Sequence, residues 1–530
     1  MVSGDHHCRG IIMASIPEAT PRHTAARHTA SRHTAATDRH RTAGHEPASQ
    51  KPDRSIHDRS IHDQLWAFNA ERLQAHLMAG NITTADIVRA SLERIGEVNP
   101  GLNAIIDVYE DEAIAAATEV QRSRRRHRRL RGVPVTIKDN IESKGHIMSD
   151  GSVTLKNNRC TQDAPLVSRL RDGGALIMGR TNCPPFCWQL FGSNELYGST
   201  LNPVNHRYTP GGSSAGAAAS VASGMVPIAH GNDVAGSIRY PAYANAIVGI
   251  KPTTGLIPGS DTPQDRPFAF QMFASQGLLA RTVTDARLGF DAMRGYAAGD
   301  PASIACEMEY DAQPHRVGVY LGDEISVTTP SVRNAVLHAA RGFEEMGWTV
   351  EYIETDAFRQ LFRLEILLLF GQFLHSGADE IAAGGEILRR GLAGAHGTLE
   401  TLYGDGYRLT LDDYIAGLAE RGSAIRKLRK LQDRYPIIIT PASAETPFLL
   451  DEDQTASRER AIDMTFSVWP MYAPPIAGLP GMVLPTDVEY DGIHLGVQLL
   501  ARVYDENTLF RAGRDLERYF ALDHDPVDPR

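Results

Sequence analysis

The chain has 530 residues, a formal net charge of −10 and a hydrophobic content of 42%. This composition supports a sizeable buried core, and the length suggests several domains or one large α/β enzyme. The acidic balance argues against nucleic acid or an anionic membrane surface as a partner. No apolar run approaches the roughly 20 residues of a membrane span, and no secretory signal pattern is visible, so we expect a cytoplasmic protein.

The N-terminal residues 1–62 differ in composition from the rest. RHTA recurs at Arg22, Arg27 and Arg32, and nine of the 20 histidines fall in this stretch. With few large apolar side chains it cannot offset its conformational entropy, so we expect disorder. A histidine-rich metal tract is one interpretation. We favour a tail without function, translated from a start codon placed too early, because the histidines lack metal-ligand spacing.

A single domain is expected over residues 63–522, followed by a C-terminal tail at 523–530. Thr83 and Asp86 form the pattern of a capping box ahead of an amphipathic helix that should stop before Pro100. Further segments follow in chain order: a strand at 133–137, a helix and strand over 167–179, a helix at 213–223, strands at 226–230 and 316–320, a helix at 331–346, strands at 436–440 and 482–485, and a helix at 506–520. This alternation indicates a three-layer α/β architecture.

A lysine and two glycine-framed serine segments carry the chemistry. Lys138 ends the apolar run VPVTIK, Ser213 and Ser214 follow two glycines at a helix start, and Ser237 closes the turn NDVAGS. Amide hydrolysis needs a nucleophile, a base and donors for the developing oxyanion. Lysine acts as a base only when neutral, which burial favours. The turn before Ser237 can gather backbone N–H groups into an anion-binding nest.

Other interpretations of these segments are weaker. The GGSSAG segment lacks the Gly-Lys-Ser/Thr of a phosphate loop, no GxSxG elbow is present nearby, and we interpret His230 as structural. Five cysteines form a sparse, odd set, which indicates a reducing compartment. Cys183 and Cys187 flank Pro-Pro-Phe without further ligands at metal spacing. We therefore predict no metal and no cofactor.

These segments resemble the amidase signature family. GRTNCPPF (179–186), GIKPTTGLIP (249–258) and AGLPGMVLP (477–485) add to the resemblance, which covers roughly residues 65–520. It implies a three-layer fold with a large mixed central β-sheet and helices on both faces. It also implies that Lys138 is the base, Ser213 a relay held by a cis peptide bond, and Ser237 the nucleophile. The implied oxyanion hole consists of the backbone N–H groups of Val234, Ala235, Gly236 and Ser237.

Two residues depart from the family pattern. Asn232 stands where threonine is common, and Ala235 stands where glycine is common. At a positive φ, alanine would cost on the order of 1 kcal/mol. Backbone N–H donation survives the change, so the departure bears on substrate shape rather than activity.

The leading hypothesis is an amidase, a C–N hydrolase of linear amides that forms a serine acyl-enzyme and releases carboxylate plus ammonia or amine. The alternatives are a glutamyl-tRNA amidotransferase protein of the A type and a catalytically silent amidase-like binding protein. We expect a small-molecule amide as partner, neither nucleic acid nor membrane, and leave the oligomeric state open, with a homodimer as one alternative. The apolar segment Phe358–Leu374 is either core or a wall of the acyl pocket.

Deletion of residues 1–62 should leave both activity and thermal stability unchanged, because their composition cannot support a packed structure. The measurement compares the melting temperature and amide turnover of the full chain with those of a chain that starts at Asp63. A substantial fall in either quantity would mean that the segment is docked or functional.

Overall fold

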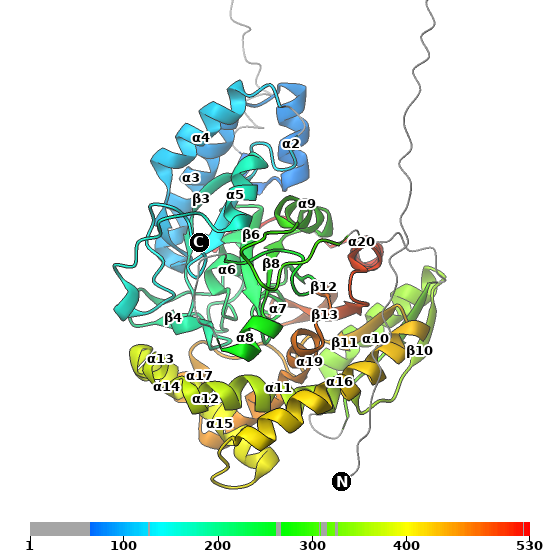
Figure 1. The fold of residues 1–530 in the computed structure, drawn as a ribbon. Coiled ribbons are helices and arrows are strands. Elements are labelled where there is room, and N and C mark those ends of the chain that lie inside the picture. The colour runs from blue at the N-terminus through cyan, green and yellow to red at the C-terminus, as the bar shows by residue number, and fades with distance from the viewer. Residues whose placement is uncertain are drawn as a thin grey trace, which may run out of the picture. The chain divides into compact units, whose positions relative to one another are not determined.

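A mixed sheet of 11 strands forms the centre of the fold in this computed structural model (Figure 1). The structure describes residues 64–125, 128–260, 267–306, 308, 315–323, 327–522 and 524–529. The predictions for residues 1–62 lie outside this part of the chain. None of the described helices combines the length and apolar character needed to cross a bilayer.

The sheet is built mainly from segments predicted as strands. In order across the sheet the strands are β1 (Ile105–Val108), β3 (Leu176–Thr181), β2 (Pro134–Lys138), β6 (Ile228–Asp233), β8 (Ser275–Ala280), β7 (Val248–Lys251), β12 (Gly481–Tyr490), β13 (Ile493–Ala501), β11 (Ile437–Pro441), β9 (Arg316–Val319) and β10 (Thr349–Tyr352). β2 runs parallel to both β3 and β6, whereas β8, β7, β12 and β13 pair antiparallel with their neighbours. A separate two-stranded sheet joins β4 (Ser193–Asn194) to β5 (Gly198–Ser199).

Helices make up most of the remaining described chain. Up to residue 293 the α-helices are α2 (Ala70–Ala79), α3 (Thr84–Leu102), α4 (Glu110–Arg122), α5 (Pro165–Asp172), α6 (Ala215–Ala222), α7 (Arg239–Ala244), α8 (Phe268–Phe273) and α9 (Val283–Met293). Beyond residue 327 they are α10 (Pro330–Glu345), α11 (Ala357–Glu365), α12 (Gln372–Ser376), α13 (Ala378–Ala383), α14 (Gly385–Gly391), α15 (Ala393–Tyr403), α16 (Leu411–Arg434), α17 (Glu452–Thr455), α18 (Arg458–Ser467), α19 (Trp469–Ala477) and α20 (Glu506–Phe520). Shorter helices are η1 (Leu65–Ala67), η2 (Val153–Leu155), η3 (Pro185–Cys187) and the π-helix η4 (Ile366–Gly371).

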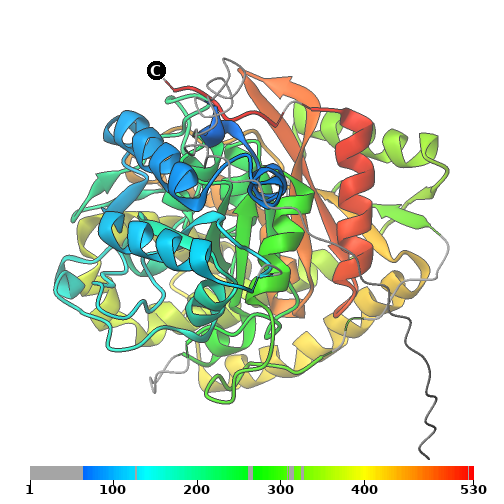
Figure 2. The ribbon, with the colours of Figure 1, turned by 90° about the horizontal axis from the view of Figure 1, so that it is seen from above.

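Both faces of the sheet are covered, as the resemblance implied. Side chains alternate along β6, so Ile228 and Gly231 face opposite sides. A Cβ on Gly289 of α9 would lie 3.2 Å from Ile228 Cγ2, whereas one on Gly231 would lie 2.8 Å from Ser214 Oγ, just before α6. Figure 2 shows α9 (green) and α20 (red) side by side on their face, where they also contact each other. The predicted three-layer α/β architecture is confirmed.

The predicted start of α3 is confirmed and its predicted end is wrong. Thr83 and Asp86 form the capping box: Asp86 N donates to Thr83 Oγ1 at 3.1 Å, and Thr83 N donates to Asp86 Oδ2 at 2.9 Å. The helix does not stop before Pro100 but includes it. Proline removes one N–H from the helix, yet Asn103 N still donates to Asn99 O at 2.8 Å, which closes the final turn beyond it.

The other predicted elements agree with the structure to within about two residues, apart from longer β6 and β12. The strand predicted at 133–137 is β2, the helix at 213–223 is α6, and the helix at 506–520 is α20. Among the helices that were not predicted are α13 to α16. The sequences of α13 to α15 are short and rich in glycine, and α16, although 24 residues long, is less strongly amphipathic than α20.

The predicted C-terminal tail is packed against the body of the protein in its described part. Val527 N donates to Ala222 O at 2.8 Å, and Arg94 Nη2 donates to Val527 O at 3.2 Å. Pro526 occupies the space that a Cβ on Gly224 would need, at 2.8 Å. The segment therefore covers the C-terminal end of α6.

Deletion of residues 523–530 should lower the free energy of unfolding by about 1–3 kcal/mol, because it exposes apolar surface and leaves buried Arg94 with one fewer acceptor. Thermal or urea unfolding measures the change. A chain that lacks only residues 529–530 is the control and should match the full chain. Equal stability of all three chains would show that these contacts do not matter.

Candidate active site

Lys138 lies at the carboxyl end of β2 and is completely buried. Its Nζ donates to Ser213 Oγ at 2.6 Å and to Asn232 Oδ1 at 2.8 Å. Because β2 and β6 are parallel neighbours, their carboxyl ends meet at one edge, which places Lys138 beside Asn232. The Gly212–Ser213 peptide bond is cis. The sequence had marked Asn232 only as a departure from the family pattern, not as a contact of the lysine.

The two serine segments lie against each other. Ser213, Asn232 and Ser237 line one cavity, and Ser214 N donates to the Ser237 carbonyl at 3.1 Å. Ser214 Oγ faces the backbone carbonyl of Asn232 at 3.5 Å instead of the lysine. The structure thus brings Lys138, Ser213 and Ser237 together. Ser214 instead contacts the backbone carbonyls of Ser237 and Asn232, so its contacts support the backbone of the site.

The turn that carries Ser237 is held by the side chain of Asp233. Gly236 N donates to Asp233 Oδ1 at 2.8 Å, and Ile238 N donates to Asp233 Oδ2 at 3.2 Å. Gly236 has a φ of 106°, and a Cβ there would lie 2.7 Å from Met471. Only glycine fits this position, because a side chain would be strained by the φ angle and would collide with α19.

A buried ion pair anchors this turn to the sheet. Arg239 Nη2 lies 2.8 Å from Asp233 Oδ1, and both side chains are fully buried. Arg239 Nη1 donates to Gln498 Oε1 on β13 at 2.7 Å, and Nη2 donates to the Met471 carbonyl on α19 at 2.7 Å. Burial opposes ionisation of Asp233, but the neighbouring guanidinium outweighs burial and holds the pKa of this carboxyl below its ordinary value.

Of the four residues whose backbone N–H groups were implied for an oxyanion hole, Val234, Ala235 and Ser237 line a cavity together, whereas Gly236 N donates to Asp233. Ala235 does not have a positive φ, so the strain considered for alanine at this position does not arise. The predicted oxyanion role of these groups remains a prediction.

His230 has structural contacts. Its Nδ1 accepts from the backbone N of Lys138 at 3.4 Å, and its Nε2 lies 2.9 Å from Gln276 Oε1. Burial lowers the pKa of His230 to about 4, so the ring is neutral near pH 7. The ring therefore supports the strand that ends in Lys138.

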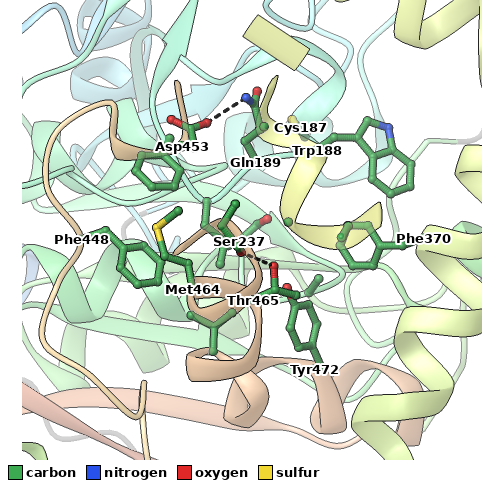
Figure 3. Close-up of a pocket in the computed structure, with 18 of the residues that line it drawn as sticks. Cys187, Trp188, Gln189, Ser237, Phe370, Phe448, Asp453, Met464, Thr465 and Tyr472 are labelled. Carbon is green, nitrogen blue, oxygen red and sulfur yellow. Dashed lines mark hydrogen bonds between the residues drawn. The ribbon is translucent and has the colours of Figure 1, made fainter. Parts of the chain in front are cut away.

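Ser237 lies where two cavities meet. The first, shown in Figure 3, is largely apolar and aromatic. Its wall includes Trp188, Phe191, Leu369, Phe370, Phe448, Met464, Thr465 and Tyr472. The second lies on the Ser213 side and contains more polar groups. Both are lined by Cys187, Trp188, Val234 and Ser237.

One part of the segment Phe358–Leu374 lies in the core and another part lines the first cavity, so each of the two predicted roles applies to part of it. Phe358 and Phe362 in α11 are fully buried core residues. Leu369 and Phe370 in the π-helix η4 line the first cavity. A π-helical turn rotates the side chains relative to a regular α-helix, so a helical periodicity could not locate the residues that face the cavity.

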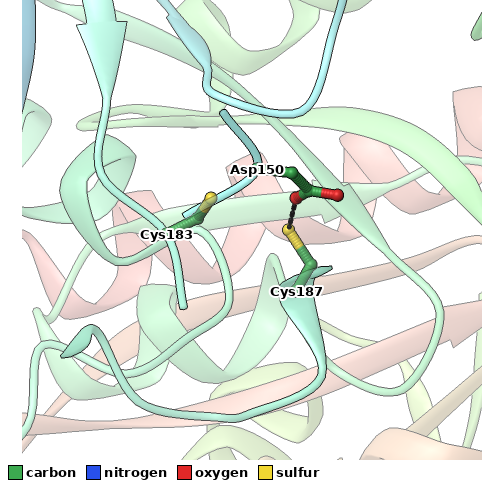
Figure 4. Close-up of side chains that lie close together, drawn as sticks. All are labelled: Asp150, Cys183 and Cys187. Atoms are coloured by element: carbon green, nitrogen blue, oxygen red, sulfur yellow. Dashed lines mark hydrogen bonds between the residues drawn. The ribbon is translucent and has the colours of Figure 1, made fainter. Parts of the chain in front are cut away.

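Two cysteines and a carboxylate cluster beside Ser213. The candidate ligand atoms of Asp150, Cys183 and Cys187 all lie within 4.8 Å of one another (Figure 4). A hydrogen bond joins Cys187 Sγ and Asp150 Oδ1 at 3.3 Å, and Asn140 Nδ2 donates to the same sulfur at 3.2 Å. Burial and the neighbouring Cys187 raise the pKa of Asp150 well above its ordinary range. Sequence spacing missed this group because Asp150 comes from a distant loop.

Comparison with known proteins agrees with this geometry. The Amidase family profile matches residues 86–510. The chain belongs to the amidase signature family. It is 31% identical over 463 residues to an indoleacetamide hydrolase of Bradyrhizobium diazoefficiens, covering 86% of each chain. It is 29% identical over 484 residues to the A component of the glutamyl-tRNA(Gln) amidotransferase of Lactiplantibacillus plantarum, covering 84% of this chain and 95% of that one.

Among solved structures, 6-aminohexanoate cyclic dimer hydrolase superposes with a TM-score of 0.75 at 25% identity, covering 88% of this chain and 99% of that one. The family and these relatives make the protein an enzyme that hydrolyses amides, a C–N hydrolase. They leave its individual substrate open.

Replacement of Arg239 by Met should lower the free energy of unfolding by about 3–5 kcal/mol, because it leaves the buried charge of Asp233 uncompensated. It should also slow labelling of Ser237 by a fluorophosphonate, since the turn loses its anchor. Urea unfolding and labelling rates measure the two effects.

The matched control is Arg207→Met. Arg207 also pairs with an aspartate, Asp491, but its side chain is 67% exposed, so the loss should be about 0–1 kcal/mol. Similar losses for the two variants would contradict the anchoring role of Arg239.

Proposed function

We propose that the protein hydrolyses linear amides with an aromatic acyl group, through an acyl-enzyme on Ser237. The observation that carries this proposal is the 2.6 Å hydrogen bond between Lys138 Nζ and Ser213 Oγ, in a cavity that Ser237 also lines. A nucleophile, a relay and a buried amine are thereby within one site, as acyl transfer requires.

The proton path follows from the donors and acceptors present. Asn232 Oδ1 can only accept, so it holds one N–H of Lys138. When Lys138 acts as the base, its lone pair takes the place of the N–H that otherwise points at Ser213 Oγ across the 2.6 Å contact. Ser213 Oγ gives its proton to this amine and takes the proton of Ser237 Oγ as that oxygen attacks the carbonyl carbon. The backbone N–H groups of Val234, Ala235 and Ser237 stabilise the resulting oxyanion.

Collapse of the tetrahedral intermediate returns the proton through Ser213 to the leaving nitrogen. The C–N bond breaks, ammonia or amine departs, and the acyl group stays on Ser237. Water then attacks the ester by the same relay and releases the carboxylate. Cys187 lies next to this relay but takes no step in it.

The aromatic first cavity supports the choice of acyl group. Trp188 meets the edge of Phe370 with ring centroids 5.8 Å apart, and Phe191 stacks on Phe448 at the same separation. Such walls favour a flat ring over a flexible chain. The indoleacetamide hydrolase among the relatives acts on an amide with such a ring, as its name states, which agrees with this assignment.

A panel of amides tests the assignment. Phenylacetamide and indole-3-acetamide should release ammonia with a higher kcat/KM than hexanamide, and glutamine should be a poor substrate. The alternative, an amidotransferase protein of the A type, instead predicts glutamine as the ammonia source and dependence on partner proteins. Preference for glutamine would therefore overturn the proposal.

Ser237→Ala should lower kcat by a factor on the order of 10⁶, and Lys138→Ala should be comparably severe because the residues act as a unit. Ser213→Ala should cost about 10²–10⁴, the usual range for a proton-transfer group. Ser214→Ala is the neighbouring control and should cost least. Ammonia release measures all four variants.

Mass spectrometry of the trapped acyl-enzyme should find the adduct on Ser237. An adduct on another serine would contradict the mechanism, and so would near-normal turnover of the Lys138→Ala variant at neutral pH.

A further inference from the structure

One end of the first cavity is polar. Gln189 and Asp453 line this cavity together with Ser237, and Figure 3 shows the two side chains pointing toward one another. Gln189 Nε2 donates to Asp453 Oδ2 at 2.9 Å and to Ile387 O at 2.9 Å. Both hydrogens of the amide are therefore used, and turning the amide over would lose both bonds. The orientation of Gln189 is fixed by these contacts.

Two oxygens of this pair have no partner among the described residues. Gln189 Oε1 and Asp453 Oδ1 are both buried and accept no hydrogen bond, and the whole Gln189 residue is only 6% exposed. A buried acceptor left unsatisfied costs about 1–3 kcal/mol. Both residues line the cavity, so a ligand there that donates a hydrogen bond would offset this cost once the side chain turns its free oxygen toward it.

No described lysine or arginine forms an ion pair with Asp453. Arg390 lines the same cavity, but its Nε donates to Glu386 at 2.8 Å and its Nη1 to the Gln454 carbonyl at 3.2 Å. Burial raises the pKa of Asp453 to about 7, and the nearby Asp451 adds to the rise. A hydrogen bond donated to the free oxygen of Asp453 would stabilise the ionised carboxylate and so offset part of the free-energy cost of burying its charge.

The backbone around the pair is shaped to hold it. A Cβ on Gly391 would lie 2.1 Å from Gln189 Nε2, so any other residue at this position would displace the amide. Phe448, from the loop before α17, lines the same cavity. The polar pair is therefore a fixed feature of an otherwise apolar wall.

We propose that Gln189 and Asp453 form a specificity subsite for a hydrogen-bond donor, a ring N–H or O–H, on the aromatic acyl group of the substrate. The proposal rests on the function proposed above and adds which rings are preferred. A ring with a donor satisfies the free oxygens. A ring of the same shape without a donor buries them unpaired and is disfavoured.

Matched substrates test the subsite in the wild-type enzyme. Indole-3-acetamide is compared with 1-benzothiophene-3-acetamide, and 4-hydroxyphenylacetamide with 4-fluorophenylacetamide. The donor-bearing member of each pair should have a kcat/KM about 10–100 times higher, the value of one hydrogen bond to a buried charged group. Faster hydrolysis of 4-(aminomethyl)phenylacetamide than of both neutral donors would overturn the assignment to a ring donor.

Substitutions then locate the selectivity. Asp453→Leu and Gln189→Leu should reduce the ratio of kcat/KM between the two substrates of each pair to near 1. Asp453→Asn should retain part of the preference for the donor-bearing substrate. Asp463→Asn is the matched control, since Asp463 is exposed on α18 and does not line the cavity, and its ratio should equal that of the wild type. Fluorophosphonate titration of Ser237 counts the active sites in each preparation.

The outcomes separate the two proposals. Unchanged ratios in all the Asp453 and Gln189 variants would overturn the subsite while the amidase function stands. If a leucine variant does not fold, Asp453→Asn decides, because it keeps the shape and replaces the charged oxygen. Failure of the wild type to hydrolyse any aryl amide would instead overturn the proposed function.

Discussion

The carboxylate of Asp233 is the group on which the geometry of the active site depends. It accepts from the Gly236 N–H and from the Arg239 guanidinium, and so it fixes the turn that presents Ser237. Arg239 also donates to Gln498 on β13, which ties the same turn to the far half of the sheet. A buried ion pair adds little net stability. The ion pair instead fixes the position of the turn that carries Ser237, because the turn has one arrangement that satisfies both charges.

Parallel pairing of β2 and β6 supplies the other half of the site. The two strands end side by side, so Lys138 meets Asn232 without a long loop. Helix α6 then brings Ser213 close because it consists of small residues. A Cβ on Gly216 would lie 2.2 Å from the carbonyl of Ala104, so this close approach requires glycine. Lysine, serine and amide oxygen are thus held by rigid elements on both sides.

The sequence could predict those parts of the site that are local. Lys138 and Ser237 stand out because an apolar strand and a glycine-framed turn surround them, and the strand and helix periodicities located β2, α6 and α20. Contacts across long separations were out of reach: Gln189 and Asp453 are 264 residues apart. The π-helix η4 was missed as well, since its apolar sequence is compatible with a regular helix. Tertiary packing decides such features.

The wall of the first cavity and the strands that lead to Lys138 and Ser237 come from different parts of the chain. Leu369 and Phe370 belong to η4, and Met464, Thr465 and Tyr472 belong to α18 and α19, whereas Lys138 is the last residue of β2 and Ser237 lies shortly after β6. Substitutions in the wall therefore need not disturb the strands. For laboratory evolution, a library confined to these five helical positions would vary the shape of the cavity while Lys138, Ser213 and Ser237 stay constant.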